Sequence, residues 1–411
     1  MKKIISTFLF GSVVSQLSAL AVLPIVTRNY SVESVSFLAV FLTFFNLFSP
    51  VLALRYESFI VVDYHKARLY TSIARKVTIL NSLLLSCLVF IYFYYYSTLG
   101  FYDVFLCSLL MFILFVCYGL FLVNKSFLLV NESYRGVSIS QNLRVVIASI
   151  SKVILIPVGF IGLLLSEVIG ALLSSLVSNK LLSTQETKVN LESEIENKKE
   201  LWPKNYSFYE TIAILLNQAF MFLPTLYIGQ QFSLQSAGQF WLAYKVISLP
   251  NTQIGTAVSD AYFRKLSLIN TNERSALFSI VIKVMFVLML LGSLYYGVFF
   301  FFGTYIFEFV FGGDWTLSGQ IASVICFWRF SSFISAPLSR VIVVLGRQKI
   351  RLCYDFISIV AVCILMLYSY FLNLNITDFV FYLSITCSIL YILLGFIIIT
   401  LLRNGNENSH S

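Results

Sequence analysis

Long hydrophobic blocks separated by short polar gaps run through almost the whole chain, from Ile4 to Leu402. An α-helix of roughly 20 residues rises far enough to cross a hydrocarbon core of about 30 Å, and about twelve blocks have this length. The pattern therefore predicts an all-α integral membrane protein with about twelve transmembrane helices. The predicted spans are 4–27, 34–54, 77–98, 104–129, 137–160, 162–181, 208–229, 236–257, 277–301, 318–345, 352–372 and 379–402.

The positive charges divide the gaps into two sets. The chain has 28 Lys and Arg residues, and those outside the spans fall in alternate gaps, with Arg28 alone on the opposite side. Because Lys and Arg concentrate in cytoplasmic loops, this division predicts that both termini are cytoplasmic. Lys2 and Lys3 before an apolar run are also typical of a signal peptide. The run continues without a clear small-residue cleavage site, which favours a retained first helix.

Composition excludes several classes of protein. The chain is 59% hydrophobic and 11% charged, so it has almost no room for a soluble domain. The net charge of +9 arises at helix ends, which does not indicate a nucleic-acid partner. The seven cysteines lie in apolar blocks without CxxC spacing, and the two histidines lie in a loop and the tail. We therefore predict no disulfide framework, no metal site and no cofactor.

The connections between spans are short on the outer side. The longest predicted outer loop covers residues 302–317 and includes a turn at Gly312, Gly313, Asp314 and Trp315. Aromatic residues near the predicted outer ends are expected to form an interfacial belt. They are Tyr92, Tyr94, Tyr95, Tyr96, Tyr102 and Trp315. The main hydrophilic insert, residues 183–204, is predicted to be a solvated cytoplasmic linker.

A weak internal repeat divides the chain into two halves. Residues 30–34 (YSVES) match residues 232–236 (FSLQS), and Ser15 and Gln16 match Asn217 and Gln218. Both halves begin at the cytoplasmic side, so the repeat is parallel, as in many transporters. The predicted organisation is an N-terminal six-helix lobe (1–182), a linker (183–207), a C-terminal six-helix lobe (208–403) and a cytoplasmic tail (404–411).

Two cations lie deep in spans of the second half. Lys245 is about 14 Å into its span at 1.5 Å per residue, and Arg329 is at a similar depth. An ionisable group at the centre of a transmembrane helix costs roughly 2.5–3.5 kcal/mol, so it usually faces a cavity or a partner. No acidic residue lies at a comparable depth in this half, and an anionic ligand would explain both cations.

The first half has polar residues of its own within the membrane. The fifth span carries Gln141, Arg144, Ser151 and Lys152, and the next carries Glu167. Lys152 and Glu167 are expected to form a pair, either structural or involved in ion coupling. No Gly-rich phosphate loop, Ser/His/Asp set or facing carboxylate pair accompanies them, so we predict a transporter and not an enzyme, and one that is not driven by ATP on this chain.

Three stretches resemble the Wzx-type O-antigen and oligosaccharide flippases, a polysaccharide transporter family within the multidrug/oligosaccharidyl-lipid/polysaccharide exporter superfamily. The first is SQLSALAVLPIVTRNYSVESVSFLAVF followed by LALRYESFIVV, with Leu54, Arg55, Tyr56 and Glu57 at the end of the second helix. The second covers residues 237–267 and the third residues 311–349.

The resemblance implies two lobes around a central cationic cavity, in the inner membrane of a bacterium. The implied substrate is an undecaprenyl-pyrophosphate-linked oligosaccharide, moved from the cytoplasmic to the periplasmic leaflet for surface polysaccharide synthesis. Membrane lipids, a polysaccharide polymerase and a chain-length regulator are the implied partners. The predicted substrate-binding residues are Lys245, Arg329, Arg144, Lys152, Asn217 and Gln218. Arg55 and Glu57 are predicted at the cytoplasmic mouth, each paired with another element and acting as a gate.

Other functions remain open at this point. An ion-coupled multidrug exporter of the same superfamily would need acidic cavity residues for cationic drugs, whereas the deep charges here are mostly positive. A polysaccharide polymerase or membrane glycosyltransferase would need a sizeable catalytic loop, and a scaffold protein would not explain the deep cations. The sequence leaves the sugar, the coupling ion, the polymer and the oligomeric state undetermined.

Overall fold

The computed structural model describes residues 2–62, 66–96, 100–183, 206–255, 258, 274–339, 341–342, 345 and 347–403. The chain divides into two compact units, Met1–Phe222 (unit 1) and Leu223–Ser411 (unit 2). The division falls inside α8 (Tyr206–Gln231), so this helix belongs to both units. Most of the predicted linker, residues 184–205, lies outside the described residues.

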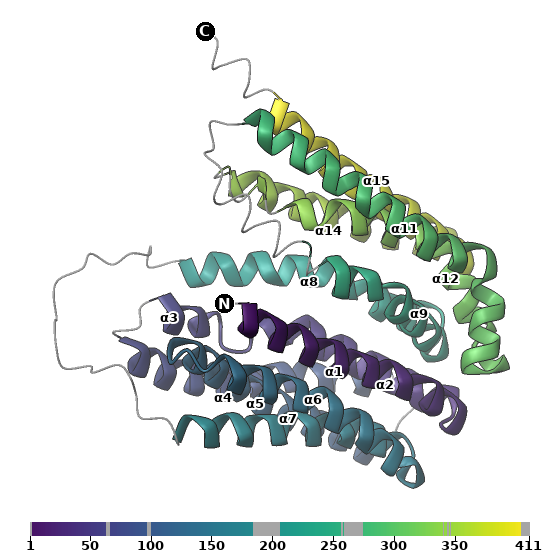
Figure 1. Cartoon of the computed structure of the whole chain (residues 1–411). Coiled ribbons are helices and arrows are strands. Elements are labelled where there is room, and N and C mark those ends of the chain that lie inside the picture. Colours follow the sequence, from purple (N-terminus) through teal and green to yellow (C-terminus); the bar gives the residue numbers. More distant parts are fainter. Residues whose placement is uncertain are drawn as a thin grey trace. The chain divides into compact units, whose positions relative to one another are not determined.

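Unit 1 is a bundle of long helices that pack side by side (Figure 1). Its elements are α1 (Lys2–Asn29), α2 (Val32–Phe48), η1 (Ser49–Val51), α3 (Tyr56–Val62), α4 (Ala67–Tyr96), α5 (Phe101–Val130), α6 (Tyr134–Ile154), η3 (Ile156–Val158), α7 (Phe160–Ser183) and the first part of α8. Helix α5 packs against α4 and α7, and α6 packs against α1 and α7. The short helix α3 lies against α4 and α5.

Unit 2 is built around α12. Its elements are the rest of α8, α9 (Leu234–Ile247), η4 (Asn251–Gly255), α11 (Arg274–Phe311), η5 (Gly313–Trp315), α12 (Thr316–Ser335), η6 (Pro337–Ser339), α14 (Gln348–Leu372) and α15 (Ile376–Arg403). Helix α12 packs against α9, α11 and α15, and α14 packs against α15. The short element η4, which follows α9, is a π-helical turn.

Glycines bring α11 and α12 into backbone contact. A Cβ on Gly319 would lie 2.5 Å from Thr304 Cα, and a Cβ on Gly303 would lie 3.0 Å from the Gly319 carbonyl oxygen. Small residues at such positions allow transmembrane helices to approach closely, and close packing replaces the hydrophobic driving force that lipid does not supply. The two helices are therefore joined along a tight seam.

The predicted spans agree with the observed helices in most places. Ten described helical segments are long and apolar enough to cross a membrane, which confirms the all-α membrane class. Helices α1 and α9, which carry the predicted spans 4–27 and 236–257, are not among these ten. Helix α9 has only 14 residues, because regular α-helix gives way near Pro250 to the π-helical turn η4.

The repeat seen in the sequence recurs in local structure. Ser31 caps α2 by accepting a hydrogen bond from the Ser34 amide at 3.2 Å, and Ser233 caps α9 by accepting one from the Ser236 amide at 3.0 Å. Serine is a favoured N-cap because its oxygen satisfies an amide that the first turn leaves free. Contacts between helices recur too, since α4–α5, α5–α7 and α6–α7 correspond to α11–α12, α12–α15 and α14–α15.

The connection between α11 and α12 differs from the prediction. Helix α11 continues through Phe311, so most of the predicted outer loop 302–317 is helical. Gly312, with φ +106°, and the turn η5 make the connection to α12. The interfacial role predicted for Trp315 is wrong, because this tight turn packs its side chain inside unit 2 with 0% exposure. Tyr94, Tyr95, Tyr96 and Tyr102 are exposed.

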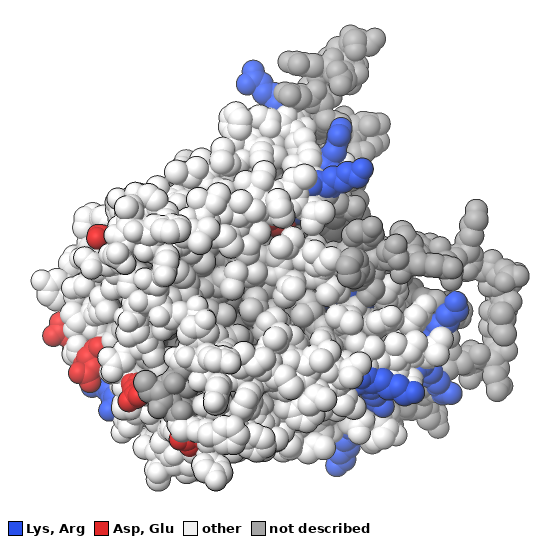
Figure 2. All heavy atoms as spheres, turned by 180° about the vertical axis from the view of Figure 1, so that it is seen from behind, with Lys and Arg blue, Asp and Glu red and all other residues white. Residues whose placement is uncertain are grey.

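Apart from Arg28 in the last turn of α1, the charged side chains named below separate along the helices of each unit. In unit 1, Glu33 and Asp103 lie in the first turns of α2 and α5, whereas Lys180 lies in the last turn of α7. In unit 2, Asp378 lies in the first turn of α15 and Arg403 in its last turn. Figure 2 shows Lys and Arg largely apart from Asp and Glu on the face in view.

Candidate functional site

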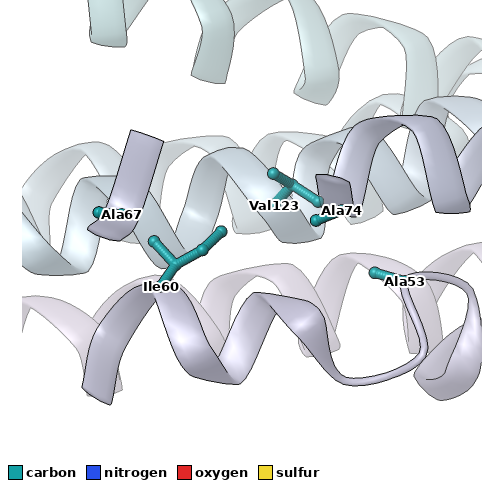
Figure 3. Close-up of a cluster of buried hydrophobic side chains, with 5 residues drawn as sticks. All are labelled: Ala53, Ile60, Ala67, Ala74 and Val123. Atoms are coloured by element: carbon teal, nitrogen blue, oxygen red, sulfur yellow. The ribbon is translucent and has the colours of Figure 1, made fainter. Parts of the chain in front are cut away.

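A strained turn precedes α3 and positions the first charged cluster. Leu54 and Arg55 have positive φ angles of 46° and 64°, a left-handed conformation that costs a non-glycine residue about 1–2 kcal/mol. Apolar packing holds the turn and α3 in place: Ala53 and Ile60 are buried against Ala67, Ala74 and Val123 (Figure 3). The cost of the turn is met by a well-packed surrounding structure, as is common where strain serves function.

Arg55 lies between two carboxylates. Its Nη1 donates to Glu57 Oε1 at 3.0 Å, and its Nη2 donates to Glu210 Oε1, near the start of α8, at 2.8 Å. The prediction that Arg55 and Glu57 each pair with another element is wrong for Glu57. That prediction assumed a continuous helix, in which residues two apart face different ways. The left-handed turn instead brings Arg55 and Glu57 together, and Glu210 supplies a partner for Arg55 from a second element.

Glu57 is the most buried member of this cluster. The whole residue is 7% exposed, and its Oε2 atom has no hydrogen-bond partner among the described residues. Burial raises the pKa of the Glu57 carboxyl above its usual value, while the Arg55 guanidinium acts in the opposite direction. The nearby Glu210 carboxylate raises this pKa further. The cluster is therefore rich in negative charge for its depth in the unit.

Lys152 and Glu167 form a second ion pair. Lys152 Nζ, on α6, lies 2.5 Å from Glu167 Oε1, on α7, and both side chains are nearly buried. The Tyr30 hydroxyl also donates to the Lys152 carbonyl oxygen at 2.8 Å. The pairing expected from the sequence is present, and it leaves little positive charge on Lys152 for a ligand.

Arg144 is held by aromatic rings. Its guanidinium carbon lies 4.9 Å from the ring centroid of Tyr118, on α5, and 5.6 Å from that of Phe45, on α2. Among the described residues, Arg144 forms no ion pair with a carboxylate. An aromatic face attracts a cation but carries no net negative charge, so these ring contacts do not supply Arg144 with a counter-ion. The N–H donors lie in the plane of a guanidinium, so contact through its face leaves them available for other partners.

Aromatic rings also surround the deep cations of unit 2. Lys245 Nζ lies 4.5 Å from the Trp241 ring centroid, one helical turn away on α9. The Arg329 guanidinium carbon lies 4.9 Å from the Tyr244 ring centroid and 5.7 Å from that of Trp328. Arg329 also donates from Nη1 to the Tyr244 hydroxyl at 3.3 Å. Arg329 is only 5% exposed, whereas Lys245 is half-buried.

The turn after α9 is fastened to α11 and α12 beside Arg329. The Asn251 side chain donates to the Arg329 carbonyl oxygen and to Ser332 Oγ, both at 3.3 Å. Its Oδ1 accepts a hydrogen bond from the Tyr296 hydroxyl at 2.6 Å. This network fixes the backbone that carries Arg329.

The predicted substrate-binding residues are divided between the two units. Arg329 and Lys245 lie within unit 2, and Arg144, Lys152 and Glu167 lie within unit 1. Asn217 and Gln218 are half-buried on the part of α8 that belongs to unit 1. No set of three His, Cys, Asp or Glu side chains in the described residues is arranged to hold a metal ion.

The aromatic partners were missed in the sequence. Trp241 could have been found, because it precedes Lys245 by four residues and such residues are neighbours on a helix. Tyr118 and Phe45 could not, since they come from helices distant in sequence from Arg144. The contact of Glu210 with Arg55 could not be found either, because the two residues are 155 positions apart in the sequence.

Comparisons with known proteins identify the fold. An inward-facing multidrug resistance MATE family transporter of the MOP superfamily matches with a TM-score of 0.66 and 15% identity, over 95% of this chain and 96% of that one. The lipid II flippase MurJ, in an inward closed conformation, matches with a TM-score of 0.69 and 16% identity, over 95% and 87%. An outward-facing MATE transporter of the MOP superfamily matches with a TM-score of 0.61 and 14% identity, over 97% and 94%.

The chain thus has the two-lobed helical fold of the MOP-superfamily transporters, and the fold class expected from the sequence is confirmed. The three neighbours are described as transporters or flippases. No protein-family model matches the sequence, and neither does any curated protein.

Proposed function

We propose that this protein is a flippase that moves an undecaprenyl-pyrophosphate-linked oligosaccharide from the cytoplasmic to the periplasmic leaflet of a bacterial inner membrane. The observation that carries the proposal is the set of cations held over aromatic rings, Arg144 in unit 1 and Lys245 and Arg329 in unit 2. Burying a cation in a membrane is costly unless a negative charge balances it, and among the described residues no carboxylate forms an ion pair with Arg144. A pyrophosphate would supply such a charge.

The three cations have different roles in this proposal. Arg144 and Lys245 are half-buried and contact the pyrophosphate or acidic sugars directly. Arg329 is nearly buried, so it acts mainly through its positive field and by positioning Tyr244. Lys152 is balanced by Glu167 and serves mainly to hold α6 against α7. The amides of Asn217 and Gln218 offer hydrogen bonds to sugar hydroxyls.

A multidrug exporter is the second candidate, because MATE transporters share the fold. A cationic drug would require acidic groups near the middle of the membrane. The acidic residue seen deep in unit 1, Glu167, is already paired with Lys152. The lipid-linked anion therefore fits the described charges better, and MurJ, described as a lipid II flippase, shows that this fold is used for a lipid-linked substrate.

The two candidates can be separated with purified protein in vesicles. We expect the protein to transfer a fluorescent undecaprenyl-pyrophosphate oligosaccharide between leaflets, and we expect no accumulation of a cationic dye under an imposed proton or Na⁺ gradient. Empty vesicles provide the control. Dye accumulation without lipid transfer would favour the exporter, and elongation of the glycan would identify a polymerase.

We further propose that both termini and the linker 183–207 are cytoplasmic. The support is the separation of charges, since basic residues gather at cytoplasmic helix ends. Reporter fusions after Asn197 and after Gly313 should report opposite sides of the membrane. Fusions that report the same side would contradict this orientation.

Arg55 and Glu57 are proposed to control the cytoplasmic mouth, because their turn ties α3 to the start of α8. A polysaccharide polymerase and a chain-length regulator are the partners proposed to use the exported units. Deletion of the protein should stop surface polymer formation while lipid-linked units accumulate on the cytoplasmic leaflet.

A further inference from the structure

We propose that Arg55, Glu57 and Glu210 form a binding site for one exchangeable proton, and that this proton sets how firmly Arg55 holds α8. The proposed use of this site in transport rests on the flippase function. The site itself is independent of the substrate, because it follows from the contacts and charges of three side chains.

The charge balance of the cluster calls for a proton. Two carboxylates share one guanidinium, so the fully ionised cluster carries a net charge of −1. The side chains of Arg55, Glu57 and Glu210 are 24%, 9% and 25% exposed, respectively. An uncompensated charge at such depth is costly, and two carboxylates that share a site favour protonation of one of them. A single bound proton makes the cluster neutral.

The geometry offers a place for this proton. Glu57 Oε1 and Glu210 Oε1 accept hydrogen bonds from Arg55, whereas the Oε2 atoms of both carboxylates are buried without a hydrogen-bond partner among the described residues. Protonation forms an O–H bond at Glu57 Oε2 and breaks no covalent bond. The proton comes from water and returns to water when it leaves.

Among the described residues, the charged groups that act on Glu57 are Arg55 and Glu210. Helices α4 and α5, which also pack against α3, present Ala67, Ala74 and Val123 to the buried cluster, with Tyr70 and Phe127 at its edge. Tyr56 and Tyr70 are the titratable side chains packed against this apolar cluster, and α4 and α5 also carry Arg68, Arg75, Lys76 and Lys125. The electrostatic state of the site therefore depends mainly on the three members of the cluster.

The proton changes the hold of Arg55 on α8. With Glu57 protonated, the ion pair of Arg55 is made with Glu210, and α8 is held firmly. With Glu57 ionised, the two carboxylates repel each other and compete for Arg55, so the hold on α8 is weaker. Burial favours the protonated Glu57 carboxyl while Arg55 holds α8. Linkage therefore requires that loss of the proton favours separation of α8 from Arg55.

Two features make this change consequential. Leu54 and Arg55 are in strained left-handed conformations, so the turn stores energy that the cluster retains. Helix α8 belongs to both units, so a weaker hold on its first part affects the helix that the units share.

The test uses the full-length protein in vesicles without substrate. Spin labels at Val61 on α3 and Ile212 on α8, both exposed, report the distance between these helices. We expect one narrow distance distribution at about pH 5 and a broader, longer one at about pH 8.5, with a midpoint above the usual value for a glutamate carboxyl.

Glu57→Gln, which mimics the protonated form, should keep the narrow distribution throughout. Asp355→Asn, which breaks a similarly buried contact with Arg351 in unit 2, is the matched control and should titrate like the wild type.

Each result decides the matter. An unchanged distance across this pH range, or the same titration in Glu57→Gln, would overturn the proposal. If Glu57→Gln does not fold, Glu210→Gln is measured instead, and loss of the narrow distribution at low pH is expected. Repeating the titration in Na⁺ and in a large organic cation tests the alternative ligand, since a narrow distribution that depends on Na⁺ and not on pH would assign the site to Na⁺. A pH-dependent distance without lipid transfer would reject the flippase function alone, whereas transfer with an unchanged pH profile in Glu57→Gln would reject only the role of the proton.

Discussion

Lys245→Ala and Arg329→Ala should each abolish or strongly reduce polymer export per inserted molecule. Lys245 is proposed to contact the substrate, and a hydrogen bond to a charged group contributes about 1.5–3 kcal/mol, so its loss corresponds to roughly a 10- to 100-fold loss of activity. Removal of Arg329 deletes its positive field and releases the Tyr244 side chain. Arg329→Lys should restore only part of it, because Lys offers a point charge in place of a planar guanidinium over Tyr244. The measurement is surface polymer divided by the amount of protein in the membrane.

Dividing the surface polymer by the amount of membrane protein distinguishes a loss of substrate binding from a loss of folded protein. Arg329 is nearly buried, so a purely structural role would lower the amount of inserted protein and leave the export per molecule unchanged. Lys283→Ala, which removes an exposed cation on α11, is the control and should export normally. Normal export per molecule in both alanine variants would refute the proposed contribution of these cations to substrate binding.

Glu167→Leu should destabilise the protein by about 3–5 kcal/mol, because it leaves the nearly buried Lys152 without its counter-charge. The double variant Lys152→Met with Glu167→Leu should recover most of the lost stability, since apolar residues of similar volume often replace a buried pair without cost. Thermal unfolding in detergent measures both. Equal destabilisation in the single and double variants would show that the pair is not the source of the loss.

The same double variant examines ion coupling. If it is stable and still transfers lipid, the Lys152–Glu167 pair is structural. If it is stable but inactive, the pair takes part in transport, which the sequence left as an alternative.

The helices were largely predictable because membrane-spanning segments have a strong and simple signal. The hydrophobic blocks predicted α4 through α8 and α11 through α15 with errors mainly at the ends. The short helix α3 was missed, because seven residues after a turn do not produce a periodic pattern. The extension of α11 to Phe311 was missed because its end depends on Gly312 and on packing of Trp315 that a local pattern does not reveal.

The candidate site was less predictable than the fold. The deep cations Arg144, Lys245 and Arg329 could be found by their cost in a membrane, and so could the Lys152–Glu167 pair. Their surroundings depend on tertiary contacts, such as Tyr118 beside Arg144 and Glu210 beside Arg55. The left-handed turn at Leu54 and Arg55 has no glycine to mark it, so the sequence did not indicate that Arg55 and Glu57 would meet.

The close contact at Gly303 and Gly319 joins α11 and α12, so we expect these two helices to move as one rigid unit. Helix α11 has 38 residues, and a helix of that length extends about 57 Å. Two rods joined side by side resist bending far more than either rod alone. A displacement near η5 would therefore be transmitted along both helices together. It would reach Arg329 on α12 with little bending of either helix.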